Sequence, residues 1–458
     1  MQTQLSQRSA TITLPSLFLF WVPLAVMWLL MAVEQPSLNA AMARLPRAAL
    51  HLAAFEVAFG LTLVIESPIL QMLSAGTALV TGRRSYRSLL RFMHSLAVIL
   101  TAAQFVLSRP VVFSWIAGGL LGVPAETVEP ARQVYAILVP FSALVGYRRL
   151  WQGALIRAGE TGLVARTMVL RLVATVGFLV VGGVMNLRGG AGVPAGHVVA
   201  ATALLIGVFT GAVSSWWYFR RRVLPRLTDN PEEEVKGLGQ LLAFYVPLSL
   251  TSVMALVSRP VLAFGISRSV APFLSLAAWP VVQSLLFMFT SIGLSYQEAV
   301  VAKMGTHGEN EGVLRRFGLI FSGILTALFM VLAYTGGSAL WFDHIAGLEP
   351  DLIALARPAM MVLVLMPLLI TGRSYFSGVL VSRDSTSFLG YSVVANTLVL
   401  VSLVVALPRF TTLPGATVAA IAFTGANLAQ VLFLWWGDAR SRRAIRLSQN
   451  TAVNARGA

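Results

Sequence analysis

The sequence predicts an all-α, polytopic membrane protein whose twelve transmembrane helices form two parallel-repeat six-helix lobes. Three observations carry this prediction. Of the 458 residues, 57% are hydrophobic and only 11% are charged, against about 25% in soluble domains. Apolar runs of about 20 residues, long enough to cross ~30 Å of hydrocarbon, recur along the chain. The second half also repeats the pattern of the first half, as expected for a transporter built from internal repeats.

The repeat is clearest between residues 20–44, FWVPLAVMWLLMAVEQPSLNAAMAR, and residues 244–268, FYVPLSLTSVMALVSRPVLAFGISR. The two stretches align without a gap at an offset of 224 residues. Further matches follow at offsets of 225 and 219, so the repeat extends over the whole chain. The matched residues include Pro36 with Pro260, Arg44 with Arg268, Arg148 with Arg373, Gly153 with Gly378, and Trp216 with Trp435.

The apolar runs give six spans in each half. Because six is an even number, both halves enter the membrane in the same orientation, which makes the repeat parallel. We expect a first lobe at 1–225, a cytoplasmic linker at 226–237 and a second lobe at 238–458, the last ending in a short basic tail. The predicted spans are 17–41, 50–73, 89–107, 130–155, 162–185, 195–219, 241–264, 270–294, 317–340, 352–380, 388–407 and 414–436.

The distribution of basic residues predicts the orientation. Most of the 34 lysines and arginines fall in segments that share one side of the membrane with both termini. Since cytoplasmic loops are enriched in lysine and arginine, we expect a multi-pass protein of the plasma (inner) membrane with both termini cytoplasmic. The net charge of +16 is explained in the same way, and no nucleic-acid partner is predicted.

Composition also excludes several kinds of chemistry. The chain has no cysteine, so neither disulfides nor thiolate metal sites are available, and its five histidines show no spacing typical of metal ligands. No set of nucleophile, base and orienting residue is evident. We therefore predict no metal, no cofactor and no enzymatic activity.

Ionisable residues inside the spans are the candidates for function, because each costs about 2.5–3.5 kcal/mol at the bilayer centre. Glu34 lies two residues before Pro36, and Arg259 lies directly before Pro260. A proline frees a backbone carbonyl about one turn earlier, which leaves polar groups able to meet water or an ion. We predict Glu34, Glu66 and Glu298 as ion-coupling residues, and interpret Glu56 as interfacial. The repeated Arg148 and Arg373 are interpreted as anchors at the cytoplasmic side.

The eighth span carries polar residues on one helical face. Gln283, Thr290 and Gln297 are seven residues apart, and so are Ser284, Ser291 and Glu298. This spacing predicts a water-lined path, and packing against a neighbouring helix is the alternative. The predicted substrate-binding residues are Arg259, Gln35, Gln283, Thr290 and Ser291.

The seventh span, with FYVPL and SRPVLAFGISR, resembles that of the progressive ankylosis proteins, and the first span, with VPL and EQPSLN, resembles their first helix. The AWPV that includes residues 279–281 also fits their eighth helix. These proteins belong to the multidrug/oligosaccharidyl-lipid/polysaccharide (MOP) superfamily, which includes the multidrug and toxic compound extrusion (MATE) transporters. The resemblance implies a secondary transporter that exports citrate, nucleotides or pyrophosphate. Glu34, Gln35 and Arg259 are the positions shared with the family pattern.

The function predicted from these observations is export of a small organic or phosphate-containing anion by alternating access, with a cavity between spans 1, 2, 7 and 8. Two alternatives remain. One is a proton- or sodium-coupled multidrug antiporter, in which Glu34, Glu66 and Glu298 bind the cation. The other is a flippase for lipid-linked saccharides. For Arg259 the sequence also leaves open an ion pair with Glu34 instead of a contact with substrate.

Overall fold

The computed structural model describes residues 12–188, 194–228, 237–304, 309–383 and 387–457. These residues are helical apart from short connections, and nine of their helices are long and apolar enough to cross a membrane. The helices of the first half are α1 (Leu14–Ala32), α2 (Glu34–Ala43), α3 (Ala48–Glu66), α4 (Met72–Leu79), α5 (Arg83–Leu107), α6 (Pro110–Ser114), α7 (Ala125–Ile137), α8 (Phe141–Arg157), α9 (Thr161–Arg188) and α10 (Gly196–Arg222). Those of the second half are α11 (Leu238–Leu256), α12 (Ser258–Ser267), α13 (Pro272–Leu294), α14 (Tyr296–Lys303), α15 (Glu311–Tyr334), α16 (Gly337–Ala339), α17 (Pro350–Val362), α18 (Met366–Ser382), α19 (Ser387–Phe410) and α20 (Gly415–Gly457).

The other three predicted spans each consist of two shorter helices that meet at a break. In the first and seventh spans the break falls at Val33 and at Val257. Pro36 and Pro260 explain both breaks, because a proline cannot donate a hydrogen bond to the carbonyl four residues earlier. Those carbonyls belong to the residues at which α1 and α11 end. In the fourth span, α7 and α8 meet at Pro140.

The helix boundaries repeat along the chain. α7 and α17 begin 225 residues apart and end 225 residues apart, and α8 and α18 do the same. Two π-helical turns, Trp115–Leu120 and Leu340–Ile345, also follow this offset. The parallel repeat of the fold is therefore confirmed. The lobe boundaries at residues 225 and 238 stay a prediction, and most of the linker lies outside the described residues.

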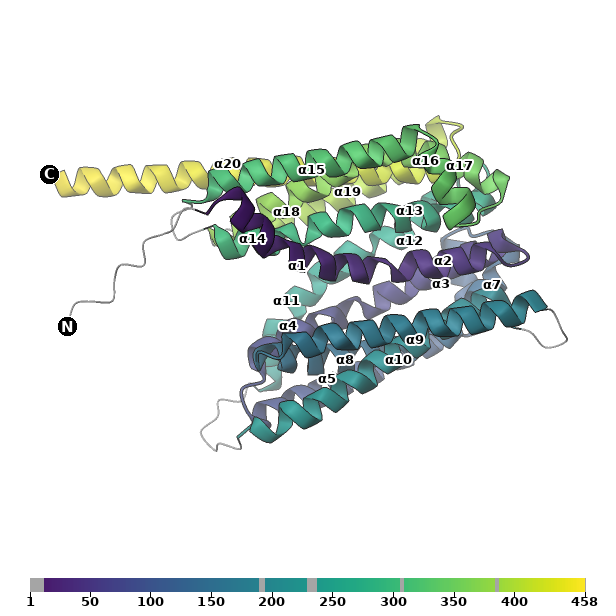
Figure 1. Ribbon diagram of the computed structural model, residues 1–458, viewed down its shortest axis with the longest axis horizontal. Helices are drawn as coiled ribbons and strands as arrows, with labels where there is room; N and C mark the ends of the chain where they lie inside the picture. The colour runs from purple at the N-terminus through teal and green to yellow at the C-terminus, as the bar shows by residue number, and fades with distance from the viewer. Residues whose placement is uncertain (1–11, 189–193, 229–236, 305–308, 384–386, 458) are drawn as a thin grey trace.

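Two helical bundles make up the molecule (Figure 1). The first bundle contains α2–α10 and the second bundle contains α12–α20. The start of α1 and the end of α20 lie at the same end of the molecule, which we call the terminal end, and the opposite end is the distal end. The bundles approach each other at the distal end and diverge toward the terminal end.

The bundles meet along a seam formed mainly by α3 and α13, with α2 and α12 beside them. Both central helices carry fully buried alanines, such as Ala54 on α3 and Ala278 on α13, and small residues let helices approach closely within a membrane. The amide nitrogen Nδ2 of Asn39 on α2 donates to the carbonyl of Pro280 on α13 at 2.9 Å. The seam thus contains the first, second, seventh and eighth spans.

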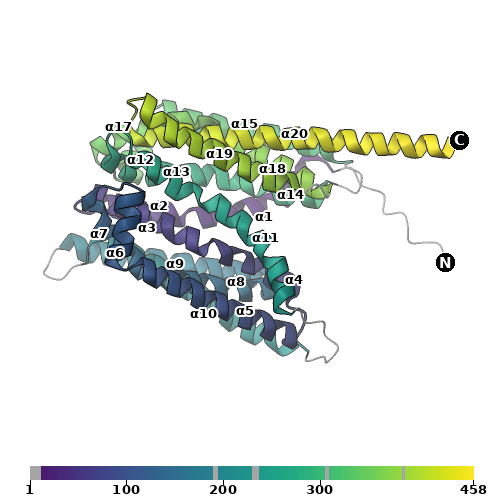
Figure 2. The same ribbon diagram turned by 180° about the vertical axis from the view of Figure 1, so that it is seen from behind.

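Toward the terminal end, α1 and α11 each contact the opposite bundle (Figure 2). The indole nitrogen of Trp21 on α1 donates to the hydroxyl of Ser295 at 2.9 Å. The hydroxyl of Tyr245 on α11 donates to the carbonyl of Pro68 at 2.7 Å. Trp21 and Tyr245 are 224 residues apart and occupy equivalent positions of the repeat. The two broken helices therefore bridge the bundles reciprocally.

Candidate functional site

Five ionisable side chains gather inside the first bundle, away from the ends of the predicted spans. We call them the interior charge cluster. They come from four different helices, so only the folded bundle brings them together. The cluster consists of Glu34 on α2, Glu66 at the end of α3, Arg148 and Arg149 on α8, and Arg171 on α9.

Glu34 and Arg171 form the best-defined contact of the interior charge cluster. The guanidinium of Arg171 donates to both carboxylate oxygens of Glu34, with Nε 3.0 Å from Oε1. The hydroxyl of Thr175, one turn further along α9, donates to the same Oε1 at 3.2 Å. Bidentate pairing of this kind fixes both side chains. The carboxylate of Glu34 is therefore already occupied by protein donors.

The rest of the cluster is less completely paired. Glu66 is only 4% exposed, and its Oε2 atom has no hydrogen-bond partner among the described residues. It interacts electrostatically with Arg149, Arg148 and Arg171. Arg148 is 5% exposed, its Nη1 lies 3.9 Å from the sulfur of Met168, and its Nε is without a partner in the described chain. Unpartnered buried polar atoms of this kind are candidates for a hydrogen bond with water or with a ligand.

A second ion pair crosses the seam. Nη1 of Arg259 on α12 lies 3.5 Å from Oε1 of Glu56 on α3. The Arg259 side chain is 26% exposed and that of Glu56 only 5%, and the guanidinium also lies 5.7 Å from the centre of the Phe59 ring. Gln35, the repeat partner of Arg259, has a buried Nε2 atom without a partner among the described residues. The pair couples the two bundles at the place where they touch.

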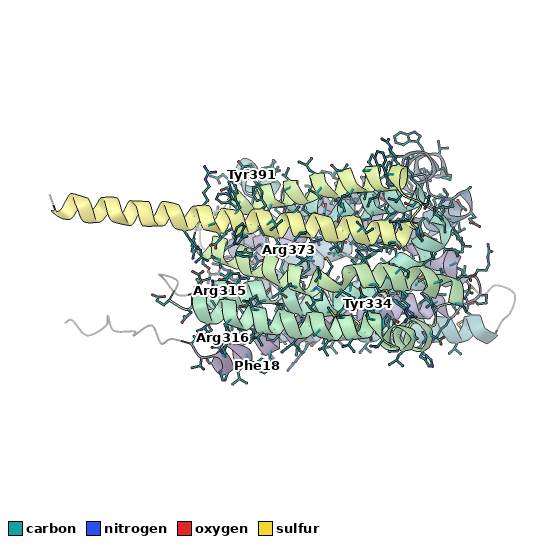
Figure 3. The ribbon with its side chains drawn as sticks, turned by 90° about the horizontal axis from the view of Figure 1, so that it is seen from above. Phe18, Arg315, Arg316, Tyr334, Arg373 and Tyr391 are labelled. Carbon is teal, nitrogen blue, oxygen red and sulfur yellow. The ribbon has the colours of Figure 1, made fainter. Side chains whose placement is uncertain are left out.

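Away from the seam, the described residues of the second bundle include the interior Arg373 on α18, which is the repeat partner of Arg148. Its Nη1 lies 3.5 Å from Oδ1 of Asn427, and no carboxylate pairs with it in the described part of the chain. Figure 3 shows it about midway along the bundle. Together, the interior charge cluster, the seam pair and Arg373 hold five arginines and three carboxylates among the described residues, so this set of charges is basic. A separate network in the second bundle pairs Arg383 and Arg442 with Glu311 and Asp438.

The polar face predicted for the eighth span is mostly internal. Ser284, Thr290 and Ser291 are buried, and their hydroxyls donate to carbonyls of their own helix α13 at 2.9–3.0 Å. Gln283 is partly buried. Glu298 lies on the separate helix α14, is exposed, and accepts a 3.4 Å hydrogen bond from the indole of Trp28. These residues keep their predicted roles only as proposals.

Two interpretations made from the sequence were wrong, and one alternative that it left open is excluded. That alternative was an ion pair of Glu34 with Arg259, whereas Glu34 pairs with Arg171 and Arg259 pairs with Glu56. Glu56 is not interfacial, because the packing of α3 against α13 buries it in the seam. Arg148 is not a surface anchor, because its guanidinium is enclosed within the first bundle. The equivalent Arg373 is likewise interior.

Arg171 and Thr175 were missed as site residues. Arg171 lies ten residues inside α9 and well within the predicted span 162–185. An arginine so deep within an apolar helix was the signal that could have identified it. Thr175 follows one turn later, on the same helical face.

No protein-family model matches the sequence, and no curated protein matches it. Solved structures do match its fold over almost the whole chain. An inward-facing multidrug resistance MATE family transporter of the MOP superfamily aligns with a TM-score of 0.58 at 17% identity, covering 96% of this chain and 97% of that one. The lipid II flippase MurJ, in an inward closed conformation, aligns with a TM-score of 0.69 at 13% identity, covering 91% and 87%.

The fold is that of the MOP-superfamily transporters. An outward-facing MATE structure gives nearly the same TM-score, 0.57, as the inward-facing one. At these identities the similarity establishes the architecture and not the substrate. The narrower resemblance to progressive ankylosis proteins stays a prediction.

Proposed function

We propose that this protein is a secondary transporter that moves an anionic substrate across the membrane by alternating access of its two bundles. The observation that supports this most strongly is the excess of arginine over carboxylate in the interior. Every interior charge carries a desolvation cost. An anion that enters the interior lowers this cost because it supplies the missing negative charge.

The chemistry of the interior cations limits the classes of substrate that fit the protein. All five interior cations are arginines, whose planar guanidinium presents paired donors that match carboxylate and phosphate oxygens. Arg148 and Arg149 each have a buried Nε atom without a partner among the described residues. These donors suit a small organic acid or a phosphate-containing anion. The same guanidinium groups would repel a cationic drug.

The proposed route follows the seam. Arg259 is the interior arginine that lies between the bundles, and it is more exposed than Arg171. In this proposal a substrate enters between the bundles from the terminal end, toward which the bundles diverge, and meets Arg259 on α12 at the seam. In this proposal the substrate competes with Glu56 for the Arg259 guanidinium. Release of that ion pair frees the bundles to move.

Of the three predicted ion-coupling residues, we propose Glu66 as the coupling site. Glu34 is held by Arg171 and Thr175, so we favour Glu66, which retains one unpartnered carboxylate oxygen among the described residues. A buried carboxyl of this kind is suited to proton exchange. Glu298 is exposed next to Trp28, and a coupling role there belongs to the alternative of a cation-driven multidrug antiporter.

A lipid-linked anion is the second candidate substrate. The lipid II flippase is among the solved structures that share this fold, and the basic interior suits a pyrophosphate-linked lipid as well as a soluble anion. The two candidates differ in where the substrate resides. A soluble anion accumulates inside sealed vesicles, whereas a flipped lipid stays in the bilayer.

The test is transport by the purified protein in liposomes. Labelled citrate, a labelled nucleotide and ethidium are compared side by side, and a fluorescent pyrophosphate-linked lipid is followed by its accessibility to an external quencher. We expect uptake of one of the two anions without ethidium transport. Ethidium transport without anion uptake would establish the multidrug alternative, and lipid translocation alone would establish the flippase.

A further inference from the structure

A cavity of about 330 Å³ lies within the second bundle, away from the seam. Three helices line it, and each contributes residues spaced as on one helical face. Its walls carry both charged and apolar side chains. The lining residues that matter here are Arg315 and Leu319 on α15, Tyr375 on α18, and Trp435, Asp438 and Arg442 on α20.

The cavity is polar at one end and apolar at the other. Arg315 lies one turn into α15, at the terminal end of the molecule (Figure 3). Arg442 on α20 donates to Glu311, the first residue of α15, and therefore lies at the same end. Leu319 and Trp435 lie one to two turns further in, and both are exposed on the outer surface of the bundle. Because the fold is that of a membrane protein, this surface faces lipid. The cavity therefore opens toward the bilayer with its basic end at the membrane surface.

The charges at the basic end are arranged for an anion. Asp438 and Glu311 hold Arg442 and Arg383 in a network, with Nε of Arg442 2.9 Å from Asp438 and Nη2 of Arg383 2.7 Å from Glu311. Arg315 is exposed, and no acid pairs with it among the described residues. Three arginines thus face two carboxylates. The cation left over is the one that lines the opening.

The repeat supplies an internal comparison. At the offset of 219, Asp438 corresponds to Phe219 and Arg442 corresponds to Val223. Phe219 is buried against the ring of Tyr86, with the ring centres 4.8 Å apart. At these two positions the first bundle therefore has apolar side chains where the second bundle has charged cavity walls. The scaffold does not require a charge at either position.

We infer that this cavity binds the headgroup of an anionic phospholipid from the leaflet at the terminal end. The phosphate meets Arg315 and Arg442, and the start of an acyl chain lies along Leu319 and Trp435. The guanidinium groups provide paired donors for phosphate oxygens, and basic side chains at a membrane surface attract anionic lipids. The site is separate from the interior charge cluster and does not depend on the substrate that is transported.

Native mass spectrometry of the detergent-purified protein tests this inference with equimolar phosphatidylglycerol and phosphatidylcholine. We expect phosphatidylglycerol to be retained preferentially. The Arg315→Gln variant should bind phosphatidylglycerol about fivefold more weakly, because one basic side chain contributes about 1 kcal/mol to binding at an anionic lipid surface. Arg316→Gln is the matched control, because Arg316 is exposed beside it but does not line the cavity, and its binding should equal that of the wild type.

A second variant tests the cavity without changing its charge. Ala439→Phe places a ring into the lined space and should lower phosphatidylglycerol retention, while gel filtration reports whether the protein remains folded. Equal retention of both lipids by the wild type, or wild-type binding by Arg315→Gln, would overturn the inference. Protection of the wild type against heating by inorganic phosphate alone, lost in Arg315→Gln, would assign the site to a free anion instead.

Discussion

Arg44 and Arg268 stand at equivalent positions of the repeat, and each donates to backbone carbonyls of the opposite half. Nη2 of Arg44 lies 2.6 Å from the carbonyl oxygen of Ile345, and Nη2 of Arg268 lies 3.3 Å from that of Leu120. Ile345 and Leu120 are themselves equivalent, because they end the two π-helical turns. The two arginines therefore form a reciprocal pair of clamps that joins the bundles at the distal end.

Removing both clamps should open the distal end. We expect Arg44→Ala with Arg268→Ala to raise the labelling rate of a cysteine placed at Ala278, which is fully buried in the seam. A rise of roughly tenfold corresponds to a loss of about 1.4 kcal/mol in the free energy that favours the closed distal end over the open one. This is the scale of one charge-assisted hydrogen bond. The absence of native cysteine leaves this thiol as the one that reacts. Arg47→Gln, an exposed neighbour, is the control, and equal labelling in all proteins would show that the clamps do not hold the seam.

The predicted topology can be tested with the same chemistry. Cysteines at Ala125 and Glu349, both exposed at the distal end, should react with an impermeant thiol reagent applied to intact cells. A cysteine at position 222, the last residue of α10, should react only after the cells are opened. Labelling at position 222 from outside would reverse the assigned orientation.

Breaking the Glu34–Arg171 pair should destabilise the first bundle. Glu34→Gln leaves the guanidinium of Arg171 in the interior without its carboxylate, and loss of one partner of a buried ion pair costs about 3 kcal/mol or more. The double variant Glu34→Gln with Arg171→Gln removes both charges and should regain part of the thermal stability. A double variant less stable than either single variant would argue against direct coupling, and fluorescence-detected melting of the purified proteins measures all of them.

Gly153 should not tolerate a side chain. A Cβ atom there would lie 2.5 Å from the carbonyl oxygen of Leu73 and 2.9 Å from the Cα of Gly76, because α8 and α4 cross in backbone contact. We expect Gly153→Ala to cost about 1–3 kcal/mol, as overpacked substitutions do. Gly183→Ala on α9 is the matched control, since no atom of the described residues would lie within 4 Å of a Cβ atom at that position. Equal melting temperatures would disprove the close crossing.

Much of the fold could be predicted because its causes are local. A run of about 20 apolar residues predicts a span from its own composition, and Pro36 and Pro260 account for the helix breaks that precede them. The offset between the halves aligns Gly153 with Gly378 in the sequence alone. In the structure both are close-contact glycines, since a Cβ at Gly378 would lie 2.7 Å from Val300.

The partners of the charged residues could not be predicted, because they depend on how the helices pack. From the sequence, Arg259 was the one partner considered for Glu34. The packing of α2 against α9 brings Glu34 to Arg171, which is 137 residues away in the sequence. Glu56 was misplaced for the same reason, since its distance from the start of α3 says nothing about the seam that buries it.

The central claim is that interior arginines select an anion, and Arg259 at the seam offers the most direct measurement. Initial uptake of labelled citrate and of labelled nucleotide is compared in liposomes containing wild-type protein, Arg259→Lys or Arg259→Gln, with insertion of each variant checked. We predict that Arg259→Gln lowers the initial rate of anion uptake at least about tenfold, because one charge-assisted hydrogen bond to the substrate is lost. Arg259→Lys should keep part of the flux, because its charge remains without the planar fork. Anion flux by Arg259→Gln equal to that of the wild type would contradict the account.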